Sequence, residues 1–214
     1  MAEEIKKCTV VSGAPNSNID FLKMHLDRES FIIAADSGYK KLLEANIMPD
    51  CIVADFDSSE NPDLPCEIIT FPIEKSNSDT FNSIILAKER GYNDITVFFA
   101  LGGRFDHSYS NILCLDYCKK NNINCKLIDD KNRVSLITDR AVIKKEYQSF
   151  SLFAFLEPCK GVKIMGAHYD QSFFNLDKLD INPFDQFAQS NYIENDECEI
   201  TLESGTLLLI ESND

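Results

Sequence analysis

Short apolar runs alternate with helix-like patterns up to about residue 130 of this 214-residue chain. A short, wholly apolar run is typical of a strand buried on both faces, and a helix between two such strands lets them pair in parallel. Strand then helix, repeated, predicts an α/β domain with a doubly wound, mostly parallel sheet. The expected strands are 8–11, 31–35, 51–54, 68–71, 95–100 and 125–128, and the expected helices are 39–45, 81–90 and 110–120.

The pattern changes after about residue 139. Strand-like runs follow one another, separated by Gly161, Gly166 and Gly205, without a convincing helical pattern. This predicts a smaller C-terminal all-β domain, sandwich-like or barrel-like. We therefore expect two domains, 1–138 and 139–214. The second has expected strands near 142–155, 162–165, 198–202 and 207–210 and a loop-rich segment at 175–191.

The chain is acidic, with 35 Asp and Glu residues against 21 Lys and Arg and a formal net charge of −14. This charge argues against electrostatic binding to nucleic acid or to an anionic membrane surface. No apolar stretch reaches the roughly 20 residues of a membrane span, and the charged N-terminal residues lack the apolar core of a secretory signal. We expect a cytoplasmic protein whose partners include neither nucleic acid nor membrane.

The chain has eight cysteines, none in a Cys-x-x-Cys pair, and Cys51, Cys114 and Cys125 lie within apolar patterns. Free, buried thiols in a reducing compartment explain this usage best. An even number is also compatible with disulfides, which spacing alone does not pair.

Two acidic residues, Asp55 and Asp57, follow the expected strand 51–54. In an extended chain, residues two apart lie roughly 6.5 Å apart on one side, so both carboxylates can converge on one divalent cation or on two neighbouring ones. The carboxyl ends of strands are also the ligand-binding edge of open α/β sheets. A solvated acidic turn is the alternative. Because clustered carboxylates repel ATP, binding of ATP here would require divalent cations between carboxylates and phosphates.

A glycine-rich loop, Gly102-Gly103-Arg104-Phe105-Asp106-His107, follows the expected strand 95–100. Two glycines let the backbone approach a ligand closely, and the planar guanidinium of Arg104 matches phosphate oxygens. The loop therefore predicts a phosphate contact. The alternatives are a turn with a solvated Arg104–Asp106 pair and, for His107, a helix-start residue that at most orients a neighbour.

A polar segment precedes the expected helix 81–90. Ser76 or Ser78 would cap this helix, and Asp79 would lie favourably in its first turn. The functional alternative makes Asp79 a third acidic metal ligand and Lys75 a phosphate contact.

Two more segments belong to the same expected ligand edge. Ser12-Gly13 follows the first strand, and Asp36-Ser37-Gly38 follows the second. Asp36 fits a helix cap nearly as well as a ligand contact.

In order and spacing, these motifs resemble those of the thiamine pyrophosphokinases over nearly the whole chain. Ser37 and Ala54 stand where that family usually has glycine, and Ser76 stands where it has Asp. The motifs that carry the resemblance are Asp36-Ser37-Gly38, Pro49-Asp50 with Ala54-Asp55-Phe56-Asp57-Ser58, Lys75-Ser76-Asn77-Ser78-Asp79, Gly102 to His107 followed by Asn111, Asp129 with Asn132, and Ser190-Asn191.

The resemblance implies transfer of pyrophosphate from ATP to thiamine, with Mg²⁺ as cofactor, in a homodimer whose active sites draw on both subunits. It implies a nucleotide-binding catalytic domain at 1–138 and a thiamine-binding domain at 139–214. Asp55, Asp57 and Asp79 would hold the metal and, with Arg104, carry catalysis. The implied nucleotide contacts are Asp36, Ser37, Gly38, Lys75, Ser78, Gly102, Gly103, Arg104, Asp106, His107, Asn111 and Asp129.

The implied thiamine contacts are Tyr169, Ser190 and Asn191. Thiamine carries a permanent thiazolium charge, which suits an acidic pocket with an aromatic face, and Tyr169 would provide that face. A core or loop tyrosine is an equal alternative for Tyr169.

Two other functions fit part of the sequence. A phosphatase with an Asp nucleophile would use Asp55 as nucleophile and Asp57 as acid and base, but it leaves the loop 102–107 unexplained. A non-catalytic nucleotide sensor is favoured by Ser76. Retention of the three metal-binding acids and of Arg104 speaks against the sensor.

Overall fold

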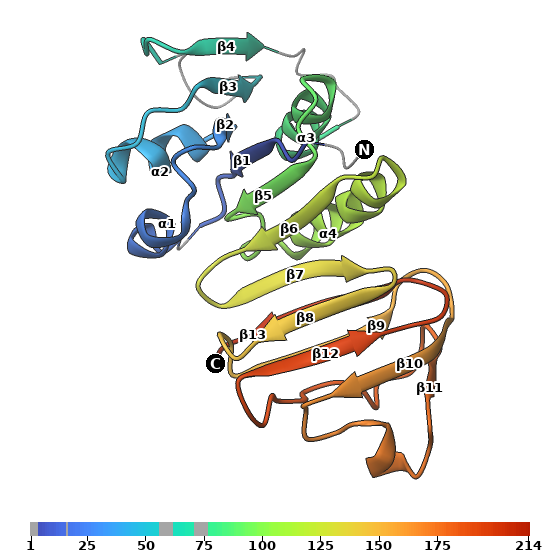
Figure 1. Cartoon of the computed structure of the whole chain (residues 1–214). Coiled ribbons are helices and arrows are strands. Elements are labelled where there is room, and N and C mark those ends of the chain that lie inside the picture. The colour runs from blue at the N-terminus through green and yellow to red at the C-terminus, as the bar shows by residue number, and fades with distance from the viewer. Residues whose placement is uncertain (1–3, 16, 56–61, 71–76) are drawn as a thin grey trace. The chain divides into compact units, whose positions relative to one another are not determined.

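The computed structural model describes residues 4–15, 17–55, 62–70 and 77–214 of the chain. The chain divides into two compact units, residues 1–130 and 131–214 (Figure 1). None of the helices in the described residues is long and apolar enough to cross a membrane.

The sheet of the first unit has the strand order β4-β3-β2-β1-β5-β6, and every neighbouring pair is parallel. Because β1 pairs with β2 on one side and with β5 on the other, the strand order reverses between β1 and β5. Open α/β sheets bind ligands at such a switch point, outside the carboxyl ends of the strands. The predicted parallel sheet is confirmed. Its strands are β1 (Lys7–Val11), β2 (Phe31–Ala35), β3 (Cys51–Ala54), β4 (Glu67–Thr70), β5 (Asp94–Phe98) and β6 (Asn124–Ile128).

Both faces of this sheet are covered. Val10 and Val11 point to opposite faces and are both fully buried, as are Ile52 and Val53. Burial on both faces explains why wholly apolar runs, and not alternation, marked these strands in the sequence.

Three expected helices are present, and a fourth helix was not expected. The fourth, α1, is short, and Leu22 is its one buried residue, so it carries no apolar period. α4 begins at Phe105, before the expected start at residue 110. The expected start was late because Phe105 and Tyr109 are exposed and hide the apolar period of the first turns. The helices are α1 (Ile19–His25), α2 (Gly38–Glu44), α3 (Asp79–Glu89) and α4 (Phe105–Lys120).

The second unit contains two antiparallel sheets and a short 3₁₀ turn, η1 (Gln171–Phe174). One sheet has the order β7-β13-β9, and the other has the order β11-β10-β12-β8. The all-β prediction is confirmed, although the polar strand β7 and the short strand β11 were not expected. The strands are β7 (Asn132–Ile137), β8 (Arg140–Lys144), β9 (Ser149–Ala154), β10 (Cys159–Met165), β11 (Leu179–Ile181), β12 (Glu197–Thr201) and β13 (Leu207–Ser212).

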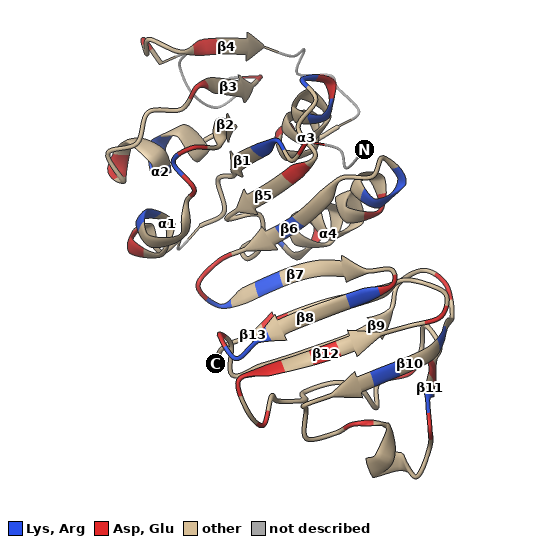
Figure 2. Cartoon of the chain, in the orientation of Figure 1, with Lys and Arg blue, Asp and Glu red and all other residues tan. Residues whose placement is uncertain are grey.

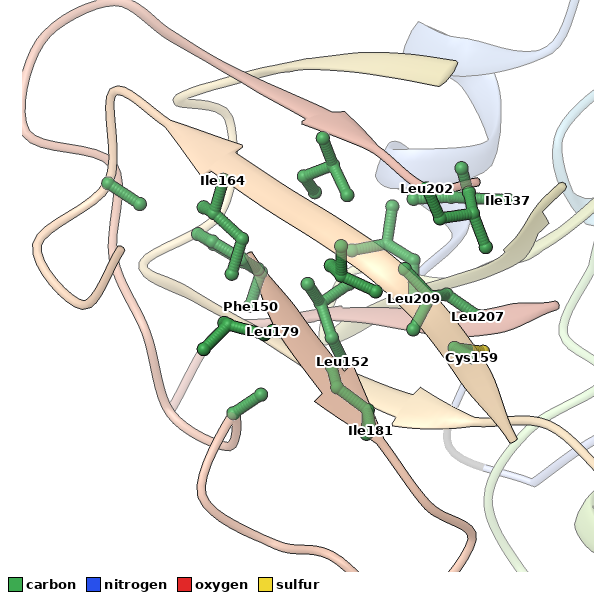
Figure 3. Close-up of a cluster of buried hydrophobic side chains, with 14 of the residues drawn as sticks. Ile137, Phe150, Leu152, Cys159, Ile164, Leu179, Ile181, Leu202, Leu207 and Leu209 are labelled. Atoms are coloured by element: carbon green, nitrogen blue, oxygen red, sulfur yellow. The ribbon is translucent and has the colours of Figure 1, made fainter. Parts of the chain in front are cut away.

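Buried side chains from both of these sheets form one core (Figure 3). Leu152 of β9 and Leu207 of β13 are fully buried in it, together with Ile181 of β11 and Ile164 of β10. The alternation of buried and half-buried residues along β9 and β13 is the pattern expected when a sheet packs against its partner on one face.

All eight cysteines are free, and each is buried except Cys66, which is half-buried. Removal from water raises the pKa of the Cys8, Cys114 and Cys198 thiols to about 12. The prediction of free thiols is confirmed. The acidic and basic residues are interspersed along both units (Figure 2).

Candidate functional site

A cavity of about 540 Å³ lies at the switch point of the first unit. Its volume is in the range of small-molecule sites, and its walls come from the carboxyl ends of β1, β2, β3 and β5 and from the first turns of α3 and α4. Eight of the predicted site residues line it, namely Asp36, Asp55, Ser78, Asp79, Gly102, Arg104, His107 and Asn111. The remaining lining residues are Ser12, Gly13, Ala14, Pro15, Ala35, Thr80, Phe99 and Ala100.

Two glycines bring the loop after β1 against the start of α2. A Cβ on Gly38 would lie 1.9 Å from the carbonyl oxygen of Val11, and a Cβ on Gly13 would lie 2.0 Å from Ser37 Oγ. Neither position accepts a side chain without movement of its neighbours. Gly38 and Ser37 are not among the lining residues of the cavity, and their predicted contacts with a nucleotide stay a prediction.

Two residues of the cavity wall adopt left-handed backbone conformations. Asp36 has φ 51° directly after β2, and Phe99 has φ 56° directly after β5. This conformation ends β5 at Phe98, short of the expected residue 100. Asp36 N donates to Val53 O at 2.9 Å, while Phe99 N donates to Ile128 O and Phe99 O accepts from Ala14 N, both at 3.1 Å. Strained backbone of this kind clusters at binding sites.

The acids at this edge come from two different elements. Asp55 directly follows β3, and Asp79 is the first residue of α3. Ser78 caps that helix, because its Oγ accepts a hydrogen bond from Phe81 N at 3.2 Å. The cap predicted for Ser78 and the first-turn position predicted for Asp79 are confirmed. Asp57 and Lys75 lie outside the described residues, as does Ser76.

Asp55 and Asp79 have the donor chemistry that Mg²⁺ prefers. Within the part of the chain that the structure describes, no three residues of the types His, Cys, Asp and Glu are grouped to hold a metal ion by themselves. Mg²⁺ in nucleotide sites is held by one or two carboxylates together with substrate phosphates and water. Two carboxylates on one cavity fit that arrangement, with the remaining ligands supplied by a polyphosphate.

The Gly102-Gly103 turn places Arg104 at the cavity. Both glycines have left-handed backbones, with φ 88° and 69°, and a Cβ on Gly103 would lie 2.8 Å from the Pro15 ring. Arg104 pairs with Asp106 through Nε to Oδ1 at 3.1 Å and Nη2 to Oδ2 at 2.5 Å. This contact lowers the pKa of Asp106 and raises that of Arg104. The predicted solvated pair is thus present, yet it uses two of the five guanidinium N–H donors and leaves others for a phosphate.

The start of α4 completes this side of the cavity. Its N-cap, Arg104, makes no side-chain capping bond, whereas His107 N in the first turn donates to Asp106 Oδ1 at 3.0 Å. The positive end of the helix dipole thus lies at the cavity. Asn111 Nδ2 donates to Ala100 O at 2.7 Å and ties the helix to the end of β5. His107 lines the cavity from the first turn of α4.

The family model for the thiamin pyrophosphokinase catalytic domain matches residues 22–127, which include most of the residues that line this cavity. The thiamine pyrophosphokinase of Bacillus subtilis (strain 168) is 27% identical over 219 residues, covering 98% of this chain and 100% of its own length. Residues 22–127 of this chain match the thiamin pyrophosphokinase catalytic domain.

Solved structures of the family agree with the fold. The crystal structure of thiamine pyrophosphokinase from Bacillus subtilis superposes with a TM-score of 0.87 at 26% identity, covering 98% of this chain and all of the other. The thiamin pyrophosphokinase from Candida albicans has the same fold, with a TM-score of 0.74 at 17% identity over 98% of this chain and 90% of its own.

Three predicted residues of the second unit form part of a tied loop. The side chain of Asn191 is buried, its Oδ1 accepts from Tyr169 N at 3.0 Å, and its Nδ2 donates to Tyr169 O at 2.8 Å. Ser190 has φ 59°, and its N donates to Ser151 Oγ at 3.0 Å. The Tyr169 ring packs edge-on against His168 and Phe173, with centroids 4.7 and 4.9 Å apart. Tyr169 is thus a loop tyrosine in an aromatic cluster, and its contact with thiamine remains a prediction.

Some predicted nucleotide contacts do not line the cavity, while other lining residues were not predicted. In the described part of the chain, Gly103, Asp106 and Asp129 are not among the lining residues. Thr80 and Phe99 line it without having been predicted. Thr80 follows Asp79 in the capped first turn, which is a readable signal, whereas the backbone turn at Phe99 has no sequence signature.

Proposed function

We propose that this chain transfers the pyrophosphoryl group of ATP to the hydroxyl of thiamine, giving thiamine diphosphate and AMP. The observation that carries the proposal is that Asp55, Asp79 and Arg104 converge on one cavity at the switch point of a chain that matches the catalytic domain of the thiamin pyrophosphokinase family. Carboxylates for a metal and a guanidinium for phosphate are the groups that phosphoryl transfer requires.

The chain's own residues position the phosphates and balance their charge. Asp55 and Asp79, with Asp57 from outside the described residues, would hold Mg²⁺, which supplies charge neutralisation and orientation of the phosphates when bound. Arg104 keeps guanidinium donors for the phosphate oxygens, and its two hydrogen bonds with Asp106 orient the guanidinium group. Lys75, which lies outside the described residues, would add a second cation.

The transfer step conserves atoms and charge. The hydroxyl oxygen of thiamine forms a bond to the β-phosphorus of ATP, while the bond from the β-phosphorus to the oxygen shared with the α-phosphate breaks. AMP leaves with that oxygen, and the hydroxyl proton passes to a carboxylate of the site. In-line attack requires the thiamine hydroxyl to face the leaving oxygen.

Thiamine recognition is assigned to the C-terminal part, 139–214, and nucleotide recognition to 1–138. The aromatic cluster around Tyr169 supports this division, because aromatic faces bind quaternary nitrogen cations such as thiazolium. Ser190 and Asn191 complete the proposed thiamine contacts. The family resemblance supports a cytoplasmic homodimer in which both subunits contribute to each active site.

The deciding experiment incubates purified protein with ATP, Mg²⁺ and thiamine and follows AMP and thiamine diphosphate by chromatography. Thiamine-dependent AMP formation, absent without metal, is the expected result. Release of inorganic phosphate with no acceptor would instead favour the phosphatase. Tight ATP binding without AMP from any alcohol would favour the sensor.

A further inference from the structure

A buried pair of hydroxyl groups lies in the cavity wall and has no part in the machinery above. Ser12 Oγ, just past β1, is 2.8 Å from Thr80 Oγ1 in the first turn of α3. Ser12 is 4% exposed and Thr80 is 9% exposed, yet both line the cavity. The pair therefore joins the central strand at the switch point to the helix that carries Asp79.

The pair has one hydrogen atom more than its internal bond uses. Each hydroxyl has one hydrogen to donate, and the bond between the two oxygens consumes only one of them. Among the residues that the structure describes, neither hydroxyl makes a second hydrogen bond. The spare hydrogen can reach an acceptor through the cavity that both residues line. A buried donor without an acceptor destabilises the protein by about 1–3 kcal/mol.

A second hydroxyl pair, formed by Thr9 of β1 with Ser30, shows the contrasting arrangement, in which both hydrogens have protein acceptors. Thr9 Oγ1 is 2.6 Å from Ser30 Oγ, and both residues are buried. Ser30 Oγ also donates to Asp27 O at 2.6 Å, so Thr9 donates to Ser30 and both hydrogens have protein acceptors. That pair does not line the cavity. In the Thr9–Ser30 pair, which joins two elements, every hydroxyl hydrogen thus has a protein acceptor. In the Ser12–Thr80 pair, one hydroxyl hydrogen has no acceptor among the described residues.

We propose that the Ser12–Thr80 pair is a binding contact for the phosphate chain of the nucleotide, donating its spare hydrogen to a non-bridging phosphoryl oxygen. In this proposal the acceptor is a ligand atom at the carboxyl edge of the sheet, next to the first turn of α3, where the helix dipole favours negative charge. The inference rests on the proposed function, since it takes ATP as the ligand. Either hydroxyl can present the spare hydrogen, because the direction of the internal bond can reverse.

The test measures two dissociation constants by calorimetry. That of ATP is measured in the presence of Mg²⁺, and that of adenosine is measured by its competition with ATP. The variant Ser12→Ala/Thr80→Val removes both hydroxyls and keeps nearly the same volume. Loss of a hydrogen bond to a charged group lowers affinity roughly tenfold or more, so we expect ATP to weaken by at least that factor and adenosine to be unchanged. Thr80→Ser keeps the hydroxyl, and its ATP affinity should stay within about twofold of the wild type.

The matched control is Thr9→Val/Ser30→Ala, which removes the second buried hydroxyl pair. It should lose stability in urea without losing ATP affinity. Equal weakening of ATP and adenosine would overturn the phosphate contact, as would unchanged ATP binding in the Ser12 and Thr80 double variant. Wild-type protein that binds no ATP would contradict the proposed function itself, a result distinct from either of these.

Discussion

The substitution Gly38→Ala tests whether the close approach of α2 to β1 holds the site together. The new Cβ would lie 1.9 Å from Val11 O, 2.7 Å from Val11 C and 3.3 Å from Ser12 N. All three are backbone atoms, which cannot rotate away as a side chain does. The start of α2 or the end of β1 must therefore move, and Ser12 in the cavity wall would move with the strand.

The expected change in the free energy of unfolding follows from two opposing effects. Alanine is favoured over glycine in a helix by at most about 1 kcal/mol, whereas forcing an atom into a packed interior costs about 1–3 kcal/mol and more against rigid backbone. We expect a net loss of about 2 kcal/mol in the free energy of unfolding, which corresponds to a fall of about 4–8 °C in Tm for a chain of this size.

Urea unfolding followed by far-ultraviolet circular dichroism measures this loss, because the α-helices of the described chain all lie in the first unit. The control is Gly91→Ala, where φ is 83° and a Cβ meets nothing within 4 Å, so that the cost is backbone strain of about 1–2 kcal/mol alone. ATP affinity should fall in the Gly38 variant and stay unchanged in the Gly91 variant. A Gly38→Ala protein as stable as the wild type, with normal ATP affinity, would refute the packing argument.

Three further outcomes are expected. Asp55→Asn should abolish AMP formation with an unchanged circular dichroism spectrum, and retained turnover would exclude Asp55 from the metal site. Glu211→Gln leaves Arg133 without its buried charged partner and should lower the free energy of unfolding in urea by about 3 kcal/mol. Glu146→Gln removes the exposed partner of the same arginine and should lower it by under about 1 kcal/mol. Equal losses in the two variants would contradict this ranking. Burial raises the pKa of Cys114 to about 12, so the folded thiol stays protonated while the unfolded thiol ionises. Its stabilisation is therefore complete below about pH 9 and lost as the pH rises toward 12, and Cys114→Ala should show a shallower fall in unfolding free energy over that window.

The elements that sequence predicts well are those whose signal is local. β2 and β3 were predicted at their observed bounds, because strands buried on both faces are apolar throughout. The cap at Ser78 was also readable, since a serine before an acid and an apolar period marks a helix start. α1 was missed because one buried leucine gives no apolar period, and β7 was missed because its half-buried polar residues interrupt the apolar ones.

The candidate site was predictable as a set of motifs but not as a geometry. Asp36, Asp55, Asp79 and Arg104 come from four places in the chain, and only the parallel order of the strands brings them to one edge. The hydrogen bonds of Asn191 with Tyr169 and of Ser12 with Thr80 join residues distant in sequence, so the local motifs that mark these positions do not predict the contacts. Such contacts follow from tertiary structure alone.

The two left-handed residues beside the switch point are retained for different physical reasons. Asp36 and Phe99 follow β2 and β5, the two strands that flank β1, and each turns the chain aside where its strand stops. Glycine at either position would remove strain of about 1–2 kcal/mol. Phe99 is 1% exposed and packs edge-on against Phe98, so burial of its ring, worth about 1.5–3 kcal/mol, offsets the strain. Asp36 is half-buried and gains no such packing, while aspartate tolerates the left-handed region better than most residues. The carboxylate of Asp36 accepts from Ser37 Oγ at 3.3 Å beside the cavity, and we expect it to contribute to ligand binding, which a glycine would not do.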